Sequence, residues 1–489
     1  MPIPKEILAV ERPKSTRVKK SGDRYLVIKR TSKRVGDRTV PVELGTIGEI
    51  KDGKYISIRE QPRKKINQVD IKDYGLFALC DKAAGDLLDE LKAVYNSSDA
   101  VRLFVIALLR AMDPDIKNRD IQFSYETSYI SEIYNNVHLS ENTISDFLED
   151  IGKRFSSITK FMTNRVEAAA GKNVIVDGTL KSNNSETNTF SEYSRKGRVK
   201  GSKDVSILYA YDPDSKEPLA ARPYPGNMLD QTALEDFSES YNIQNGVMVL
   251  DKGFFSKENL KFLKSKDSLT YILPLKNNLK LVTENGMTDD IVTPLNGYAD
   301  ATIFFKKKKV DDNCYLYAFR DPKIASEQEI GYVAQSKKKG TFSKEKLLSK
   351  RKEFGVIVFE SNSDLEPLDV YVAYDGRWEI EVMFNLYKEI MDLDTVNVHG
   401  DYRMYATEFI NYLTVIISSR VKKLLSSTVI ETKKKGKKTV DVHITEKYSY
   451  NQVIRYLSKS KMVRVGDSKK WVKNQTVKYI DELSKAIGV

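Results

Sequence analysis

With 489 residues, 40% of them hydrophobic and 10% aromatic, the chain suits several packed domains and does not have the composition of a disordered protein. Lys and Arg outnumber Asp and Glu by 80 to 68. The formal net charge of +12 favours a polyanionic partner, although a basic soluble protein without one has the same composition. Two cysteines and three histidines are too few for a disulfide framework or a convincing zinc cluster, and no apolar stretch approaches the about 20 residues that span a bilayer. We therefore expect a cytoplasmic protein without membrane contact.

The N-terminal region is predicted to be basic and rich in β-structure. Its first 35 residues contain many Lys and Arg side chains. The strand-like runs are Arg24–Lys29, Thr39–Gly45 and Lys54–Ile58. Asp52 and Gly53 are typical of a hairpin turn, so we expect the last two runs to pair.

The next region has helical periodicity. A first pattern runs from Tyr74 to Met112, with a break and cap at Ser97–Asp99 before Val101–Leu109. A further helix begins at Ser140, and its apolar stripe is Ile144, Phe147, Leu148, Ile151, Phe155 and Ile158. The stretch 129–158 fits a helix-turn-helix that lies on DNA, but such a stripe is more often packed core.

Short apolar strands then alternate with helices, an order that predicts an α/β domain. The strand Val174–Val176 ends on Asp177, and the strand Val247–Leu250 ends on Asp251. The remaining predicted elements are strands at Ser206–Tyr211, Pro218–Arg222 and Leu269–Leu275 and helices at Gln231–Tyr241 and Ser256–Ser265. The turn Asp212–Glu217 joins the first two of these strands.

A mostly β segment follows and looks inserted, because the α/β pattern resumes after it. Its predicted strands are Ala301–Val310 and Cys314–Arg320, which have an alternating residue pattern and are joined by a turn. The runs Lys306–Lys309 and Lys337–Lys339 fit either contacts with a phosphate backbone or solvated lysines. One strand face carries Tyr315, Tyr317 and Phe319.

The last part of the chain begins with a predicted strand at Leu368–Tyr374, followed by helices that include Tyr402–Leu424. A basic linker at Lys433–Lys438 precedes a final helix at Asn474–Ala486. The predicted regions are 1–70 (basic, β-rich), 71–168 (helical), 169–276 (core, first part), 277–367 (β-rich insertion), 368–428 (core, second part) and 429–489 (helical). The predicted fold class is α/β, with a mixed-sheet core interrupted by an insertion.

Asp177 and Asp251 each follow an apolar β-run, in V-I-V-D-G-T and V-M-V-L-D-K-G-F. Carboxylates at the ends of central strands lie at the carboxyl edge of a sheet, where open α/β folds build their sites. Singly, each has an ordinary explanation: an Asp-Gly turn for Asp177 and a helix N-cap for Asp251. Together they indicate a shared acidic site.

Tyr374, Arg377, Glu381 and Lys388 form the pattern Y-x2-R-x3-E-x6-K. On one helix, at about 100° per residue, these positions fall within a roughly 60° arc and face one site. For the helix alone, a solvent-facing ladder of ion pairs is the alternative.

With the two aspartates, Glu381 completes three oxygen donors that suit two Mg²⁺ ions in phosphoryl transfer. Asp375 and Glu379 are close in sequence, but only Glu381 keeps the spacing and lies on the arc.

These residues resemble the signature of DDE transposases of the bacterial insertion-sequence class marked by YREK. The match includes Asp177 in D-G-T, Asp251 in D-K-G-F and the full YREK spacing. Pro225–Asp230, followed by Thr232 and Leu234, is similar to a stretch that these enzymes carry between their aspartates. Lys252 departs from the arginine often found there but keeps its charge. The resemblance covers roughly residues 170–425 and implies an RNase H-like core with a β-rich insertion before Glu381.

The resemblance also implies roles for the residues of the site. Asp177, Asp251 and Glu381 would hold two Mg²⁺ ions, for which Mn²⁺ can substitute, and Thr179 and Lys252 are further candidates for the site. Arg377 and Lys388 would contact DNA phosphates, where a guanidinium binds in bidentate fashion, and Tyr374 would donate a hydrogen bond to one.

The expected substrates are double-stranded terminal inverted repeats and target DNA, bound by a homodimer in the bacterial cytoplasm, on the nucleoid. A hairpin intermediate is expected, with a displaced base held near Tyr315, Tyr317 or Phe319. Two alternatives stay open: an RNase H-like nuclease that does not join DNA, and a transposase-derived DNA-binding protein.

Overall fold

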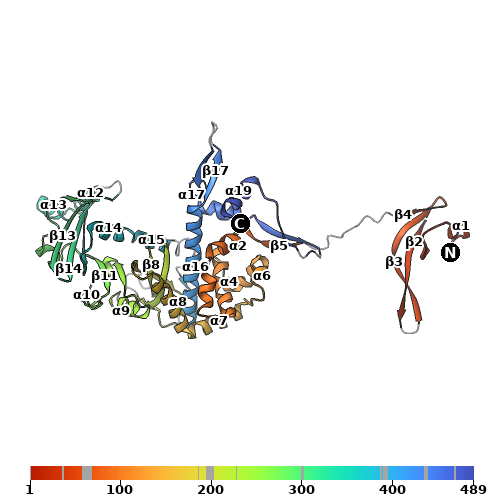
Figure 1. Cartoon of the computed structure of the whole chain (residues 1–489), viewed down its shortest axis with the longest axis horizontal. Coiled ribbons are helices and arrows are strands. Elements are labelled where there is room, and N and C mark those ends of the chain that lie inside the picture. The colour runs from red at the N-terminus through yellow and green to blue at the C-terminus, as the bar shows by residue number, and fades with distance from the viewer. Residues whose placement is uncertain are drawn as a thin grey trace. The chain divides into compact units, whose positions relative to one another are not determined.

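The computed structural model divides the chain into two compact units, Met1–Asp70 with Val463–Val472, and Ile71–Met462 with Lys473–Val489. Figure 1 labels the elements in chain order. No helix in the described ranges is long and apolar enough to cross a membrane. The described residues are 2–35, 38–57, 69–185, 187–193, 203–226, 228, 230–298, 302–385, 388, 395–433, 439–466, 468 and 470–489.

The N-terminal unit contains an antiparallel sheet ordered β1-β2-β3-β4. Its small core is formed by Val18, Val27 and Ile50. Asp52 and Gly53 turn the chain between β3 and β4 with positive φ angles of 51° and 69°, which confirms the predicted hairpin. The elements are α1 (Lys5–Leu8), β1 (Thr16–Ser21), β2 (Arg24–Val35), β3 (Arg38–Lys51) and β4 (Lys54–Ser57). The three predicted strands are therefore present, and Ile58 lies outside the described residues.

The helical region begins after β5 (Val69–Asp73). Ser140 caps a helix as predicted, because its hydroxyl accepts a hydrogen bond from the Thr143 amide. The earlier cap is Asn96, one residue before the predicted Ser97–Asp99, and its side chain accepts from the Asp99 amide at 3.0 Å. The helices are α2 (Gly75–Ala84), α3 (Leu87–Lys92), α4 (Ser97–Met112), η1 (Asn118–Asp120), α5 (Ile121–Thr127), α6 (Ile130–Ile133), α7 (Glu141–Lys153) and α8 (Phe155–Ala168).

The apolar stripe that begins at Ile144 is buried in the main core, and Phe155 packs against that core from a half-buried position. This face of α7 packs on the long helix α16 (Asp401–Ser427). The packed-core interpretation therefore holds for the stripe, and DNA contact by other faces of the stretch 129–158 stays a prediction.

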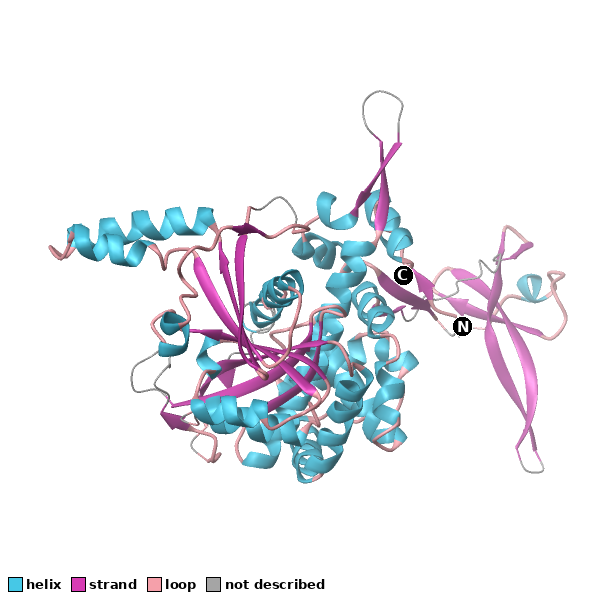
Figure 2. Cartoon of the chain, turned by 60° about the vertical axis from the view of Figure 1, so that its left-hand side comes forward, coloured by secondary structure: helices cyan, strands magenta, loops and turns pink. Residues whose placement is uncertain are grey.

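The centre of the second unit is a mixed sheet whose strands run in the order β9-β8-β6-β10-β11. β8 is antiparallel to both β6 and β9, whereas β10 is parallel to β6 and β11. Three antiparallel strands followed by two parallel ones give the RNase H-like arrangement, and Figure 2 shows helices around this sheet. The elements are β6 (Asn173–Asn183), β7 (Glu192–Tyr193), β8 (Lys203–Asp212), β9 (Glu217–Pro225), α9 (Asp230–Ser240), β10 (Gly246–Leu250), η2 (Lys252–Phe254), α10 (Lys257–Lys264) and β11 (Leu269–Leu275).

The segment predicted as a β-rich insertion extends the same sheet, because β15 pairs antiparallel with β11 and leads to β14, β13 and β12. It is less β-rich than predicted, since it also contains α12 and α13. Neither helix has a continuous apolar face: α12 buries only Ala325 and Ser336, and α13 buries no residue, so periodicity gave no signal. The elements are α11 (Lys280–Glu284), β12 (Thr293–Pro294), β13 (Phe304–Asp311), β14 (Cys314–Arg320), α12 (Pro322–Lys338), α13 (Lys344–Arg351) and β15 (Val356–Ser361).

After the insertion, the predicted strand Leu368–Tyr374 is wrong: these residues belong to α14 (Pro367–Asp375). Val370, Tyr371 and Val372 have high β-propensity, but Pro367 starts a helix well, and Pro367, Val370 and Ala373 are buried at helical spacing. The predicted helices near the C-terminus are confirmed as α16 and α19, and residues 434–438 of the predicted linker lie outside the described ranges. The remaining elements are α15 (Trp378–Asn385), β16 (Thr395–Val396), β17 (Val429–Lys433), β18 (Thr439–His443), α17 (Ile444–Lys447), α18 (Tyr450–Leu457), β19 (Lys461–Val465), β20 (Val472–Lys473) and α19 (Lys478–Ile487).

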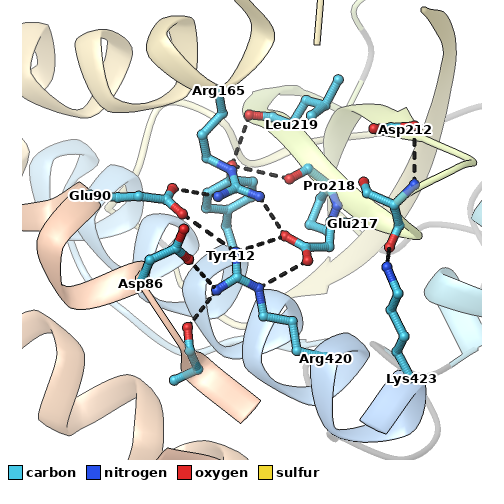
Figure 3. Close-up of polar contacts among 12 residues, drawn as sticks. Asp86, Glu90, Arg165, Asp212, Glu217, Pro218, Leu219, Tyr412, Arg420 and Lys423 are labelled. Carbon is cyan, nitrogen blue, oxygen red and sulfur yellow. Dashed lines mark hydrogen bonds and ion pairs between the residues drawn. The ribbon is translucent and has the colours of Figure 1, made fainter. Parts of the chain in front are cut away.

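Buried charges connect the helical region to the sheet (Figure 3). Arg165 of α8 forms ion pairs with Glu90 of α3 and Glu217 of β9, and Arg420 of α16 pairs with the same two glutamates. The Tyr412 hydroxyl donates a hydrogen bond to the Leu219 carbonyl at 2.8 Å. These contacts fix α16 between the helices and the sheet that carries the candidate site.

Candidate active site

Asp177 and Asp251 lie on neighbouring parallel strands at the same level of the sheet. The pairing of β10 with β6 ends at Leu250 opposite Val176, so the two aspartates follow side by side. The predicted strand end is confirmed for Asp251 but wrong for Asp177, because β6 continues to Asn183 as the antiparallel partner of β8. Only the parallel part of the sheet ends at Asp177.

Each aspartate also makes a local hydrogen bond. The Asp177 carboxylate accepts from the Gly178 amide at 2.8 Å, and Asp251 caps η2 by accepting from the Gly253 amide at 3.4 Å. The N-cap explanation for Asp251 therefore holds, while the Asp-Gly turn does not, because Gly178 is inside a strand. Neither bond uses all the acceptor capacity of a carboxylate, so both side chains can bind a further cation.

The signature residues after the insertion do not lie on one continuous helix, as the 60° arc assumed. α14 ends at Asp375, Arg377 lies in the turn, and α15 begins at Trp378. Backbone hydrogen bonds continue through the break, since the Ile380 amide donates to the Arg377 carbonyl at 3.1 Å. The predicted proximity of Arg377 to Glu381 survives, with Nη2 to Oε1 at 2.8 Å.

Arg377 contacts all three carboxylates. Its Nη1 atom lies 3.6 Å from Asp177 Oδ2 and 3.5 Å from Asp251 Oδ1, while Nη2 pairs with Glu381. The carboxylates come from β6, the end of β10 and α15, so they are far apart in sequence and converge on one guanidinium. The arginine side chain is 20% exposed and Asp177 16%, compared with 36% and 38% for Asp251 and Glu381.

The electrostatics of the site favour additional positive charge. Burial, together with the charges of Asp251 and Glu381, raises the pKa of Asp177 to about 7, against the lowering effects of the Gly178 amide and Arg377. Burial opposes the charge on Arg377, but Tyr374 and the carboxylates outweigh it and raise the pKa of the guanidinium. One arginine therefore compensates three carboxylates only in part.

Among the described residues, no group of three or more His, Cys, Asp or Glu side chains is arranged to hold a metal ion as it stands. The three carboxylates surround the guanidinium instead. They are hard oxygen donors of the kind that divalent cations prefer. The neighbouring charges of Asp251 and Glu381 contribute to the raised pKa of Asp177, and a bound cation would stabilise the three carboxylates in their charged form. The donor set therefore fits a divalent metal ion.

The other predicted site residues lie around this group. The Tyr374 ring is 5.5 Å from the Arg377 guanidinium and packs on Phe359 at 4.6 Å between ring centroids. Lys252 opens η2 directly after Asp251, and Thr179 is buried two residues beyond Asp177 in β6. Lys388 is half-buried, and the residues on both sides of it lie outside the described ranges.

The two nearby carboxylates that the spacing excluded have other partners. Glu379 forms an ion pair with Lys216 at 2.8 Å. Asp375 accepts a hydrogen bond from Tyr298, and burial together with this carboxylate raises the pKa of Tyr298 to about 12. Spacing and geometry thus select the same glutamate, Glu381.

A pocket of about 410 Å³ adjoins the carboxylate group, and sequence analysis did not single it out. Trp378, which is 66% exposed, follows Arg377 directly and lines the pocket. The position of Trp378 next to Arg377 can be read from the sequence, but its exposure and the pocket cannot. The other lining residues are Lys252, Phe319, Asp321, Ile324, Gln328, Gly355, Val356, Ile357, Tyr371, Tyr374, Asp375 and Arg377.

The aromatic residues proposed from sequence to hold a displaced base are mostly unsuited to it. Tyr317 is fully buried, and its hydroxyl is engaged with the backbone of Ser363 and Leu365. Phe319 is also buried, although it contributes to the wall of the pocket, and Tyr315 lies half-buried below Lys309. This strand face is core because α14 packs against it, with the Phe319 and Tyr371 rings 5.0 Å apart between centroids.

The insertion lysines have partners within the protein. Lys306 donates to the Gly286 and Asp289 carbonyls, Lys307 to the Leu365 carbonyl, and Lys309 pairs with Asp312. These contacts favour the solvated-lysine interpretation of the run over a row of phosphate contacts.

Comparison with known proteins gives a family match for just under half of the chain, and the matched part includes this site. Residues 170–408 match the family model described as Transposase DDE domain. Comparison with curated proteins gives no match. Among solved structures, the chain is similar to a piggyBac transposase synaptic complex with hairpin DNA, at 14% identity, 78% coverage of each chain and a TM-score of 0.38. It is also similar to a Mos1 transposase paired-end complex with left transposon end, at 8% identity, 32% coverage of this chain, 58% of that chain and a TM-score of 0.15.

Proposed function

Because the chain is a DDE transposase, with its DDE domain at residues 170–408, we propose that it cuts the ends of its own mobile element and joins them to target DNA at a site formed by Asp177, Asp251 and Glu381. The observation that carries the proposal is the convergence of these three carboxylates on Arg377. Transposases act on DNA, and the proposed substrates are double-stranded terminal inverted repeats and target DNA on the bacterial nucleoid.

DDE transposases use divalent metal ions, and we propose two Mg²⁺ ions per site, with Mn²⁺ as a substitute. When bound, such ions activate the attacking oxygen and stabilise the leaving oxygen of a phosphodiester. Asp177, Asp251 and Glu381 would hold them, and their placement on β6, directly after β10 and on α15 would keep the donors rigid while DNA binds.

The single positive charge of Arg377 has two possible partners, the site carboxylates and a DNA phosphate. Arg377 neutralises the carboxylates in the structure described here, and its planar guanidinium is suited to a DNA phosphate. We propose that it exchanges carboxylate contacts for a phosphate contact when metal ions and DNA enter. Tyr374, which packs beside it, and Lys252 and Lys388 would then contact phosphates near the cut.

We further propose that the second strand is cut through a hairpin on the element end. Three carboxylates must act on two strands of opposite polarity, and attack of the first 3′ hydroxyl on the opposite strand reuses the same site. A tight hairpin displaces a base from the stack, which costs a few kcal/mol that an aromatic pocket offsets in part. The pocket beside Arg377, with Trp378 on its wall, supports this role better than Tyr315 or Tyr317 does.

Incubation of the protein with labelled DNA from the inverted repeats that flank its gene, in Mg²⁺ or Mn²⁺, tests the proposal. Cleaved and joined products are expected. Products that are cut but never joined would instead identify a nuclease, and DNA that is bound but uncut would identify a DNA-binding protein.

A further inference from the structure

The hairpin formed by β2 and β3 extends well beyond the N-terminal sheet. β1 pairs with β2 only up to Lys29, and β4 pairs with β3 only from Gly48 onward. Between these limits the hairpin is a two-stranded ribbon, residues 31–35 paired with 38–42. Every residue of 31–35 and of 38–46 is exposed, so both faces of the ribbon meet solvent.

The ribbon carries a concentrated positive charge. Lys33, Arg34 and Arg38 lie on it, and Arg30 is at its base. Within the described part of the chain, none of Lys33, Arg34 and Arg38 forms an ion pair. The surrounding sequence is equally basic: residues 1–70 contain 18 Lys and Arg against nine Asp and Glu, so they hold +9 of the net charge of +12.

Cross-strand pairing places cations and apolar groups on one face. Residues paired directly across the strands share a face, and here Lys33 is opposite Val40, Val35 is opposite Arg38, and Thr31 is opposite Val42. The exposed fractions of Val35, Val40 and Val42 are 60%, 45% and 37%. A two-stranded ribbon is marginally stable in water by itself, and these valines bury little in the chain. Such a surface is typical of a segment that gains its contacts from a partner.

Two properties favour DNA over a second copy of the chain. Two ribbons of like charge repel each other, whereas phosphates attract them. Pro41, within β3, removes a backbone donor and so hinders strand addition along that edge. A two-stranded ribbon fits the major groove, which is about 12 Å wide, and five residues per strand span about 17 Å along it.

We infer that the β2–β3 ribbon, residues 31–35 and 38–42, inserts into the major groove of DNA, where Lys33, Arg34 and Arg38 contact phosphates and Val40 and Val42 contact base edges. The inference rests on the proposed function, because it takes DNA as the substrate. It assigns DNA docking to the N-terminal unit, whereas the sequence pattern pointed to the helical region.

The test compares two full-length variants that lose the same charge. One carries Lys33→Gln, Arg34→Gln and Arg38→Gln; the control carries Lys323→Gln, Lys344→Gln and Lys346→Gln, at exposed positions of α12 and α13. Binding of a fluorescent duplex is measured with chelator present at several salt concentrations. Loss of three phosphate contacts should reduce the slope of log K against log salt by about 2.7 in the ribbon variant and leave the control unchanged. Equal slopes in the two variants would overturn the inference.

A second measurement tests which groove of DNA the ribbon binds and whether its partner is instead a second copy of the chain. Duplexes with bulky C5 substituents on pyrimidines, which fill the major groove, should weaken binding by the unaltered protein, and a minor-groove ligand should not. The reverse pattern would overturn the inference. So would sedimentation showing that Val40→Ser with Val42→Ser abolishes self-association and leaves DNA binding intact.

These outcomes are separable from failure of the proposed function. If the ribbon variant binds DNA normally while the unaltered protein still cleaves element ends, only the ribbon assignment fails. If the unaltered protein binds no duplex and cleaves none, the proposed function fails.

Discussion

Lys181 and Glu408 form an almost fully buried ion pair, with Nζ to Oε1 at 2.6 Å and side chains only 1% and 4% exposed. Lys181 is on β6, four residues after Asp177, and Glu408 is on α16. The pair therefore ties the strand that carries the first site carboxylate to the longest helix of the chain.

Removing one partner of this pair should destabilise the protein strongly, because a buried charge is left uncompensated. We expect Lys181→Met and Glu408→Gln each to lower the free energy of unfolding by about 3–5 kcal/mol. The double variant Lys181→Met with Glu408→Leu should lose less than either single change, since no buried charge remains. Urea unfolding measures all three, and a double variant that loses the sum of the single changes would contradict this account.

Substitution of Arg377 should separate metal binding from catalysis. In Arg377→Ala, the carboxylates lose their resident cation, so Mn²⁺ measured by calorimetry should bind more tightly. Cleavage should nevertheless fall by about 10²-fold, because a donor to the reacting phosphate is lost. Arg377→Lys restores the positive charge but not the bidentate geometry, so it should recover only part of the cleavage rate. If Mn²⁺ binding weakens in Arg377→Ala, the arginine supports the metal site and does not compete for it.

Much of the site follows from sequence because its parts are local. Apolar runs predicted β6 and β10 and placed Asp177 and Asp251 at one edge, and the spacing singled out Glu381 rather than Asp375 or Glu379. The break after α14 was not foreseeable, because Gly376 is the only signal and the arc calculation assumed one helix.

Other features depend on tertiary pairing. Tyr317 and Phe319 alternate as an exposed strand face would, but α14 packs against that face and makes it core. The contact of Arg377 with all three carboxylates and the pocket at Trp378 exist only once β6, β10, α14 and α15 are assembled. No local pattern contains that information.

Trp378 offers a test of the hairpin route. If its indole stacks with a displaced base, Trp378→Ala should slow hairpin formation while the first nick proceeds, and Trp378→Phe should restore most of the rate. Denaturing gels of a precleaved end labelled on one strand would show the hairpin as a species of doubled length. Trp471→Ala is the matched control, since that indole stacks under Arg464 at 4.5 Å. Blunt ends that form without any hairpin, even when resolution is slowed, would rule out this route.

The active species should contain two chains and two element ends. Moving an element requires both of its ends to be held together, and a symmetric dimer is the usual solution for two like sites. Native mass measurement of the complex with end DNA should show this composition. An active complex that contains a single chain on a single end would contradict the prediction.

The central claim, that Asp177, Asp251 and Glu381 form the catalytic site, is tested most directly by cleavage of element-end DNA with matched carboxylate variants. Asp177→Asn, Asp251→Asn and Glu381→Gln should each lose Mg²⁺-dependent cleavage while DNA binding is retained. The control Glu379→Gln, whose carboxylate pairs with Lys216, should cleave as the unaltered protein does. Full cleavage by any of the first three variants, in a folded protein that binds DNA, would contradict the account.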